Sequence, residues 1–416
     1  MSLHDDNSKA LPPLDLSKWR SVPTVLMGVG AVGCVIGLLR GSQSVHQFGF
    51  SWLLAFMFFL SICLGGLGLV ILHHLFDAGW SVPIRRVCEQ IANLSKWMIL
   101  LFIPIAILAP RMYDWMDKVE KHTPDLATKA KYPLFTVPGF YIVSAVCLLS
   151  WWWLSSQLRK WSLKQDKTGG VDCTRQMRRY AAFGVFIYAI TLTLGAIMWV
   201  KALQHEWFST MYGVYYFAGS MWLTLATVYV IVLILQRQGP LKGLVHEKTY
   251  YFIGSLLFAF TVFYAYVTFA QYFIIWNANM PEETFWYVLR EKGTWWYLGL
   301  VIIFGHFFLP FLLLLRIDFK LKLAVMGPLF VWAWLMHFTD MSFNIVPVIH
   351  PEGYKLHWLD LACMMFFGGL LAKLFIRQLH SAPIVPQKDP RFAESQEIYV
   401  TPESLAGAKA KTGGSH

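Results

Sequence analysis

Charged residues are scarce in this chain of 416 residues: Asp, Glu, Lys and Arg make up 14% of it, whereas 56% is hydrophobic. Both values lie far outside the range of soluble globular domains, so the composition excludes a soluble enzyme or binding module. The N-terminus also lacks the basic start and small-residue cleavage site of a signal peptide, and it includes Asp5 and Asp6. We therefore expect the first apolar segment to remain in the mature protein.

Cysteine is also rare, and the six cysteines form no C-x-x-C pair. Most of them lie inside apolar runs, where a thiol behaves as a small hydrophobic group. We predict no disulfide, zinc site, iron–sulfur cluster or covalently attached haem. The residues concerned are Cys34, Cys63, Cys88, Cys147, Cys173 and Cys363.

The chain contains instead a series of long apolar runs. A helix needs about 20 mainly apolar residues to cross a bilayer. We predict an all-α, polytopic integral membrane protein whose ten-helix domain covers 22–380, between polar cytoplasmic tails at 1–21 and 381–416, the second mostly disordered. The predicted spans are 22–39, 47–75, 83–109, 135–158, 178–201, 211–236, 249–276, 295–315, 320–341 and 357–379.

The formal net charge of +11 is explained by topology. Ten crossings place both termini on one side. Of the 35 Lys and Arg residues, 24 fall on that side and 10 on the other. The positive-inside rule then places both termini in the cytoplasm, and the basic residues would contact anionic phospholipids rather than nucleic acid.

Three glycines in the first span could be mistaken for a nucleotide-binding motif. Gly28, Gly30 and Gly33 have the spacing G-x-G-x-x-G, but that motif requires a preceding strand, and these residues lie inside a membrane span. Together with Gly37 they indicate a small-residue face for close helix packing.

The stretch HHLFDAGWSVPIRRVCE joins the second and third spans and contains four charged residues. We interpret it as a cytoplasmic corner in which Trp80 is interfacial. Arg85 and Arg86 are interpreted mainly as anchors that snorkel to the head groups, with Asp77, Glu89 or lipid phosphates as partners.

Glu89 and Lys96 lie further into the third span and share a helical face. An ionisable group inside a span costs at least about 2.5 kcal/mol, so it is expected to face the protein interior and to have a partner or a function. These two residues are candidates for a proton path from the cytoplasm or for a pocket that binds a polar head group.

Histidines and carboxylates also occur in pairs near the outer ends of three spans. Histidine titrates near neutral pH and a carboxylate can be tuned to do so, so such pairs can accept protons, although interfacial hydrogen bonding is an equally good interpretation. We expect them at similar depth. The pairs are His205 with Glu206, His337 with Asp340, and His357 with Asp360.

His306 lies near the middle of the eighth span. It is a candidate for a hydrogen-bonded core residue, a proton relay or a haem ligand. Haem b with two histidine ligands would need a second histidine at matching depth, and the predicted spans offer none, so we predict no bound haem or metal.

Two stretches, FDAGWSVPIRRVCE and HEWFSTMYGVYYFAGSMW, resemble the ActF-type membrane subunits of bacterial alternative complex III. These belong to the wider NrfD and PsrC class of haem-free membrane subunits. The resemblance covers nearly the whole chain. It implies that spans two to five and six to nine form two four-helix bundles, with spans one and ten peripheral.

The same resemblance implies a subunit of a quinol oxidoreductase complex in the bacterial inner membrane. The partners would be an NrfD-like paralogue, which is the better candidate for the quinol site, an iron–sulfur protein and multihaem cytochrome c subunits. Haem c and the iron–sulfur clusters would lie in those partners. This subunit would be structural and inactive alone, with a suspected role in proton conduction. Its only ligands would be a quinone or menaquinone and phospholipids.

A secondary transporter or channel is the alternative function. Transporters often have interrupted helices around a midplane site. In this chain, Pro310 could interrupt the eighth span and Gly327-Pro328 the ninth. A lipid-modifying enzyme is less well supported, because the sequence contains no recognisable nucleophile or metal cluster.

Overall fold

All regular structure in the described part of the protein is helical. The structure is a computed structural model in which residues 21–239 and 241–395 are described. Nine helices in these ranges are long and apolar enough to cross a membrane, and a bent pair forms a tenth span when it is counted as one. The predicted all-α, polytopic membrane fold is therefore confirmed.

Most of the spans begin and end close to their predicted boundaries. The main exceptions are the fourth and fifth, because the basic segment between them is itself helical. The eighth span contains a π-helical turn, η4, between two α-helices. The helices are α1 (Ser21–Leu39), α2 (Ser42–Leu75), α8 (Val137–Thr168), α9 (Val171–Trp199), α10 (Tyr212–Arg237), α11 (Glu247–Ala278), α13 (Thr294–Ile302), η4 (Ile303–Phe308), α14 (Leu309–Leu315), α16 (Leu323–Ile345) and α17 (Trp358–His380).

The third span is divided into three helices, α3 (Val82–Ala92), α4 (Ser95–Leu101) and α5 (Ile103–Met112). The chain bends by 54° between the part that ends at Leu101 and α5. Pro104 lies in the first turn of α5, where its missing N–H is tolerated.

The two prolines that could interrupt the eighth and ninth spans differ in their local structure. Helix α16 continues through Pro328, so the ninth span is not interrupted there. Pro310 directly follows the π-helical turn η4 and lies in the first turn of α14, so the eighth span is irregular next to this proline.

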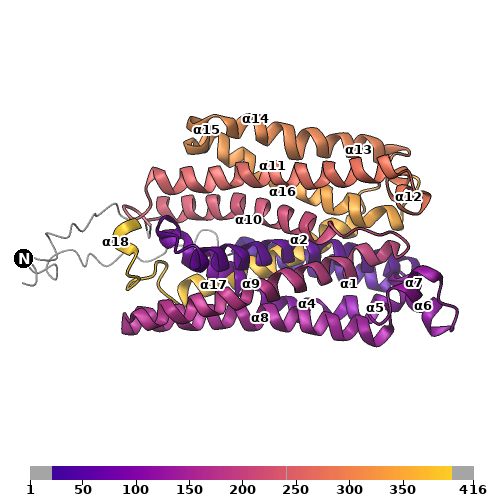
Figure 1. The fold of residues 1–416 in the computed structure, drawn as a ribbon, viewed down its shortest axis with the longest axis horizontal. Coiled ribbons are helices and arrows are strands. Elements are labelled where there is room, and N and C mark those ends of the chain that lie inside the picture. The colour runs from indigo at the N-terminus through magenta and orange to yellow at the C-terminus, as the bar shows by residue number, and fades with distance from the viewer. Residues whose placement is uncertain (1–20, 240, 396–416) are drawn as a thin grey trace, which may run out of the picture.

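The spans pack as two groups of four (Figure 1). In the first group α2, the divided third span, α8 and α9 contact one another in a ring. In the second group α10, α11, the eighth span and α16 do the same. Helices α2 and α10 join the groups, and α2 is buried along almost its whole length, which explains why its sequence is apolar on every face.

Helices α1 and α17 pack tightly against each other outside the two groups. A Cβ atom added at Gly30 would lie 2.3 Å from the backbone nitrogen of Phe366, and one at Gly33 would lie 2.7 Å from the Ala362 Cβ. Gly37 is similarly close to α17, whereas Gly28 faces open space. Three of the four glycines therefore form the predicted close-packing face.

The short helices lie at the two ends of the molecule (Figure 1). We call one end the α18 end, after α18 (Phe392–Ser395), and the other the α6 end, after α6 (Asp114–Glu120). The α18 end also contains α15 (Ile317–Leu321), and the α6 end contains α7 (Leu126–Ala130) and α12 (Pro281–Arg290).

The segment 384–395, which we call the strap, packs across the α18 end against α2, α3 and α8. We had expected a mostly disordered tail beyond residue 380, and this expectation was wrong for the residues that make these contacts. Residues 1–20 and 396–416 of the two predicted tails lie outside the described residues.

Candidate functional sites

A buried cluster of charges occupies the α18 end of the first helix group. Helix α3 places Arg85 and Arg86 on the same face as Glu89. Arg85 Nε lies 3.1 Å from Glu89 Oε1, and Arg86 Nη1 lies 3.0 Å from Glu89 Oε2. Asp389 of the strap pairs with Arg85, and Asp166 of α8 pairs with Arg86.

These contacts correct our interpretation of the two arginines. A snorkelling side chain keeps its charged end in the head-group region. The side chains of Arg85 and Arg86 are instead fully buried, and each is bound by two carboxylates of the same chain. Intramolecular ion pairing has replaced lipid anchoring at this corner.

The strap connects this cluster to solvent. Arg391 binds Asp389, which is buried, and Asp77, whose side chain is 49% exposed. Arg391 also lies 3.1 Å from His73 Nε2. Burial acts against the charge of Asp389, but the Arg85 and Arg391 guanidinium groups have the larger combined effect and lower the pKa of Asp389.

Trp80 and Lys96 do not belong to the cluster. Trp80 is half-buried and its ring packs against Phe252 of α11. Lys96 is half-buried and lies over the ring of Trp97, and no hydrogen bond or ion pair within the described residues joins it to Glu89. Helix α3 ends at Ala92 and α4 begins at Ser95, so a short break in the helix separates Glu89 from Lys96.

A second buried polar cluster lies inside the second helix group. Asp340 of α16 is 2% exposed. Its Oδ1 accepts hydrogen bonds from the hydroxyls of Tyr215 at 2.5 Å and Tyr264 at 2.7 Å. Asn344, one turn further along α16, donates to the Tyr215 hydroxyl and accepts from the Tyr212 hydroxyl. These contacts hold the Asp340 carboxylate from two neighbouring helices.

His306 and His337 complete this second cluster. His337 Nε2 lies 3.0 Å from the Ser61 hydroxyl of α2. The His306 ring is stacked between the rings of Trp222 and Tyr264, each with its centroid 3.9 Å away. Both histidines are fully buried.

Four polar atoms of the second cluster have no hydrogen-bond partner. They are both ring nitrogens of His306, Nδ1 of His337 and Oδ2 of Asp340. Each of these residues offers one ligand atom that lies within 4.8 Å of the others. We call these three residues the central trio.

The proximity of the two histidines corrects our expectation that His306 lacks a second histidine at matching depth. We had placed His337 near the outer end of the ninth span. Helix α16 extends to Ile345, eight residues beyond His337, which is about 12 Å at 1.5 Å per residue. His337 therefore lies deeper than the predicted boundary implied.

Arg290 closes the second cluster at the α6 end. Its guanidinium donates to the carbonyls of Phe343 and Asn344, and Nη1 lies 3.1 Å from Gln204 Oε1. Burial lowers the pKa of Arg290 to about 9. The arginine caps the final carbonyls of α16, as a cation near a helix C-terminus can.

His205 and Glu206 lie at the α6 end in a separate, more exposed cluster. His205 Nε2 is 2.6 Å from Asp125 Oδ2, and Lys118 Nζ is 3.0 Å from the same oxygen. Burial acts against the charge of Asp125, but hydrogen bonds from His205, Thr128 and Lys118 prevail and lower the pKa of Asp125.

His357 and Asp360 form a capping box at the start of α17. Asp360 Oδ2 accepts from the His357 backbone N–H at 2.9 Å, and its Oδ1 accepts from the Ser51 hydroxyl at 2.5 Å. Ser51 and Ser61, which binds His337, are ten residues apart on α2, about 15 Å. The expectation that the three histidine and carboxylate pairs share one depth was therefore wrong.

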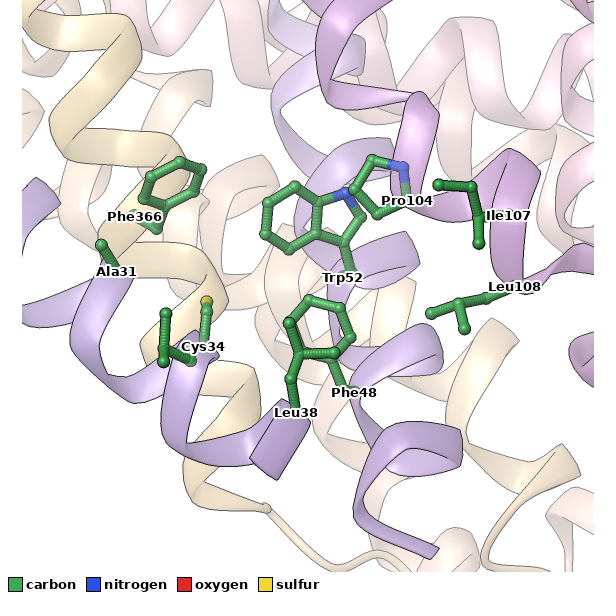
Figure 2. A pocket seen from close by; sticks show the side chains of 10 residues that line it. Ala31, Cys34, Leu38, Phe48, Trp52, Pro104, Ile107, Leu108 and Phe366 are labelled. Atoms are coloured by element: carbon green, nitrogen blue, oxygen red, sulfur yellow. The ribbon is translucent and has the colours of Figure 1, made fainter. Parts of the chain in front are cut away.

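An apolar groove lies between α1, α2, α5 and α17 on the outside of the first helix group (Figure 2). Its volume is about 400 Å³. Trp52 lies with its Nε1 bonded to the Leu101 carbonyl, so it presents only its ring to the groove. Ile107, one of the lining residues, is 71% exposed, so the groove faces the lipid side of the protein.

Sequence patterns could not indicate several residues of these clusters. Asp166 and Asp389 reach Arg86 and Arg85 from 80 and 304 positions away in the chain. Tyr264 has no neighbouring charged residue that would have drawn attention to it. A buried charge predicts that a partner exists, but only the packing of the helices identifies that partner.

Comparison of the sequence with models of known protein families and with curated proteins produced no match to either.

Proposed function

We propose that this chain is a haem-free membrane subunit of a bacterial quinol oxidoreductase of the alternative complex III type. The arrangement of its spans supports this proposal most directly. Two groups of four helices, with the first and tenth spans paired outside them, match what the resemblance to the ActF-type subunits implies. The chain would lie in the inner membrane with both termini in the cytoplasm, next to its quinol-oxidising paralogue.

Native purification tests this assignment. The chain should copurify with iron–sulfur and multihaem cytochrome c subunits, which would hold the redox cofactors, and it should be colourless and inactive when isolated. Recovery of the chain from native membranes as a stable protein without partners would contradict the proposal.

A proton-conducting role is supported by the cluster at the α18 end. Three carboxylates lead inwards from the half-exposed Asp77 through Asp389 to the buried Glu89, with an arginine between each pair. Carboxylates accept and release protons, and this end of the molecule is the one that the positive-inside rule assigns to the cytoplasm. Glu89 would be the innermost group of this uptake path.

Substitution of Glu89 tests the path. Glu89→Gln should lower proton-coupled turnover about a hundredfold or more, the range attributed to a positioned acid or base, and Glu89→Asp should restore part of it. Asp166→Asn is the matched control, because it also removes a carboxylate from Arg86 but lies outside the path. Turnover is measured per assembled complex, so that a loss of assembly is scored separately.

The two variants distinguish a path from a structural ion pair. Equal loss of turnover in Glu89→Gln and Asp166→Asn would show that the arginines merely need a counter-charge. Unchanged turnover and proton release in Glu89→Gln would remove the relay role altogether.

The groove of Figure 2 supports a second role for the subunit, the binding of a quinone, menaquinone or phospholipid chain. Its lining is apolar throughout, as the isoprenoid or acyl chain of such a molecule requires. Ser51 lies within one helical turn of the lining residues Phe48 and Trp52, and its hydroxyl donates to the buried Asp360 of α17. This pair would be a polar partner for a head group.

A secondary transporter or channel is the alternative function. The 54° bend in the third span and the π-helical turn in the eighth support it, because irregular helices commonly occur at functional positions in membranes. Solute flux through proteoliposomes that contain only this chain would favour the alternative over the quinol oxidoreductase subunit.

A further inference from the structure

The central trio has the composition of a metal site. His306, His337 and Asp340 supply two imidazoles and one carboxylate, and one ligand atom from each lies within 4.8 Å of the others. All three side chains are buried, and the atoms without hydrogen bonds are ones that could bind a cation. Buried polar atoms without a partner are costly, so four of them in one small cluster require an explanation.

Two of the three side chains, His337 and Asp340, are held as metal ligands are. A ligating histidine usually bonds through its other nitrogen to a neighbouring group, and a ligating carboxylate is itself hydrogen-bonded. His337 makes such a contact from Nε2 to Ser61, and Asp340 Oδ1 accepts from Tyr215 and Tyr264. These bonds orient His337 and Asp340 and leave the opposite atom of each side chain free.

The local fold directs the trio towards one point. The π-helical turn η4 carries His306, and π-helical turns occur frequently at functional sites. Gly219 of α10 makes room for His337, because a Cβ atom there would lie 3.2 Å from the imidazole Cε1. The rings of Trp222 and Tyr264 then fix the plane of His306 between them.

We propose that His306, His337 and Asp340 bind a divalent transition-metal ion. Two imidazoles and a carboxylate suit Zn²⁺, Co²⁺ or Fe²⁺, with at least one coordination position left for a further ligand. At a bond length of about 2.1 Å in tetrahedral geometry the three ligand atoms, which lie within 4.8 Å of one another, would approach to roughly 3.4 Å. The Asp340 charge offsets part of the charge of the ion.

The other histidine and carboxylate group lacks this arrangement. Asp125, His205 and Glu206 also offer ligand atoms within 4.8 Å of one another. The Asp125 carboxylate already binds Lys118 and His205, and Glu206 is exposed. No unpaired atom of these three residues is buried.

The inference does not depend on the proposed function. On α2, Ser61 at the trio and His73 at the α18 end are 12 residues apart, which corresponds to about 18 Å. A metal at the trio and a proton path through Glu89 are therefore separate properties of the chain.

The test is metal binding by the full-length chain purified in detergent. After incubation with Zn²⁺ and removal of free ion, metal analysis should give about one Zn²⁺ per chain, and Co²⁺ should produce a visible absorption band from His and carboxylate ligation. His337→Gln and Asp340→Asn should each weaken binding at least about tenfold, by analogy with the losses seen when a metal site is perturbed.

His74→Gln is the matched control, because His74 is also buried and both of its ring nitrogens are unpaired, but it lies outside the trio. It should retain the bound metal. Size-exclusion chromatography and circular dichroism identify variants that have not folded, and the two trio variants serve as independent tests. Absence of bound Zn²⁺ and Co²⁺ from the folded parent chain, or equal retention by His337→Gln and His74→Gln, would overturn the proposal.

Discussion

Buried cations are compensated differently at the two ends of this protein. At the α18 end Arg85 and Arg86 each meet two carboxylates. At the α6 end, no carboxylate among the described residues lies within ion-pair distance of Arg290 or Lys201. Arg290 is bound by backbone carbonyls, whereas Lys201 lies beside Lys131 and near the Phe208 ring. Lys201 is thus the less well compensated cation.

The protonated form of Lys201 should therefore destabilise the protein. Burial, with the added effect of Lys131, lowers the pKa of Lys201 from 10.5 to about 7. Between pH 7 and pH 10.5 the unfolded chain binds more protons at this position than the folded protein does. The cost in folding free energy is therefore full below about pH 7 and disappears above about pH 10.5. Lys201→Met should raise the thermal unfolding temperature in detergent by a few degrees near pH 6 and by much less near pH 10.

Lys118→Met provides the control for this prediction. Asp125 raises the pKa of Lys118 by hydrogen bonding, so the charged form of this lysine is favoured in the folded protein and its stabilisation is present below pH 10.5. The variant should unfold at the same or a lower temperature near pH 6. An equal increase in the unfolding temperature of both variants would show that the gain comes from added apolar surface, and it would contradict the prediction.

At the scale of the element, the strap is held by buried charges as well as by apolar contacts of Ile384, Val385 and Phe392. Asp389 is buried and binds both Arg85 and Arg391. Lys388 Nζ also donates to the Lys167 carbonyl, and the Gln387 N–H donates to Asp166. Loss of Asp389 would remove the main link between the strap and α3.

Asp389→Asn should therefore release the strap. Removal of one partner from a buried ion pair typically costs about 3–5 kcal/mol, because the other charge stays buried without compensation. Arg391 is 9% exposed in the folded protein, so trypsin should cut after it slowly. In the variant this cleavage should be at least about tenfold faster. A loss of about 1.4 kcal/mol or more in the stability of the closed strap raises the population of the open form by at least this factor.

Asp318→Asn is the matched control, because Asp318 pairs with Arg316 and Lys322 on an exposed surface. Such pairs contribute about 0–1 kcal/mol, so cleavage after Arg391 should keep the rate of the unaltered protein. Mass spectrometry of the fragments identifies the site. Equal cleavage in Asp389→Asn and in the unaltered protein would show that apolar contacts hold the strap.

Hydropathy predicted the spans well because a membrane helix needs a long apolar run whatever its partners are. It could not locate the bend before α5 or the turn η4, since both lie in sequence that is as apolar as a regular helix. It also failed for the strap. Residues 384–395 are polar in composition, and their partners in α2, α3 and α8 lie more than 200 positions away.

For the whole molecule, the polar clusters are distributed along the long axis of the helix groups. The Glu89 cluster lies at the α18 end, the Asp125 cluster lies at the α6 end, and the central trio lies inside the second helix group between them. Helix α2 contributes to two of the three through His73 and Ser61. The direction in which this axis crosses the membrane decides which cluster meets the cytoplasm.

Cysteine labelling can establish that direction. All six native cysteines are buried, so they should react poorly with a maleimide that does not cross membranes. Lys167 and Lys121 are exposed, at the α18 end and the α6 end respectively. Because the basic residues concentrate at the α18 end, Lys121→Cys should label in intact cells and Lys167→Cys only after permeabilisation. The reverse pattern would place the termini outside, and Glu89 could then no longer take up protons from the cytoplasm.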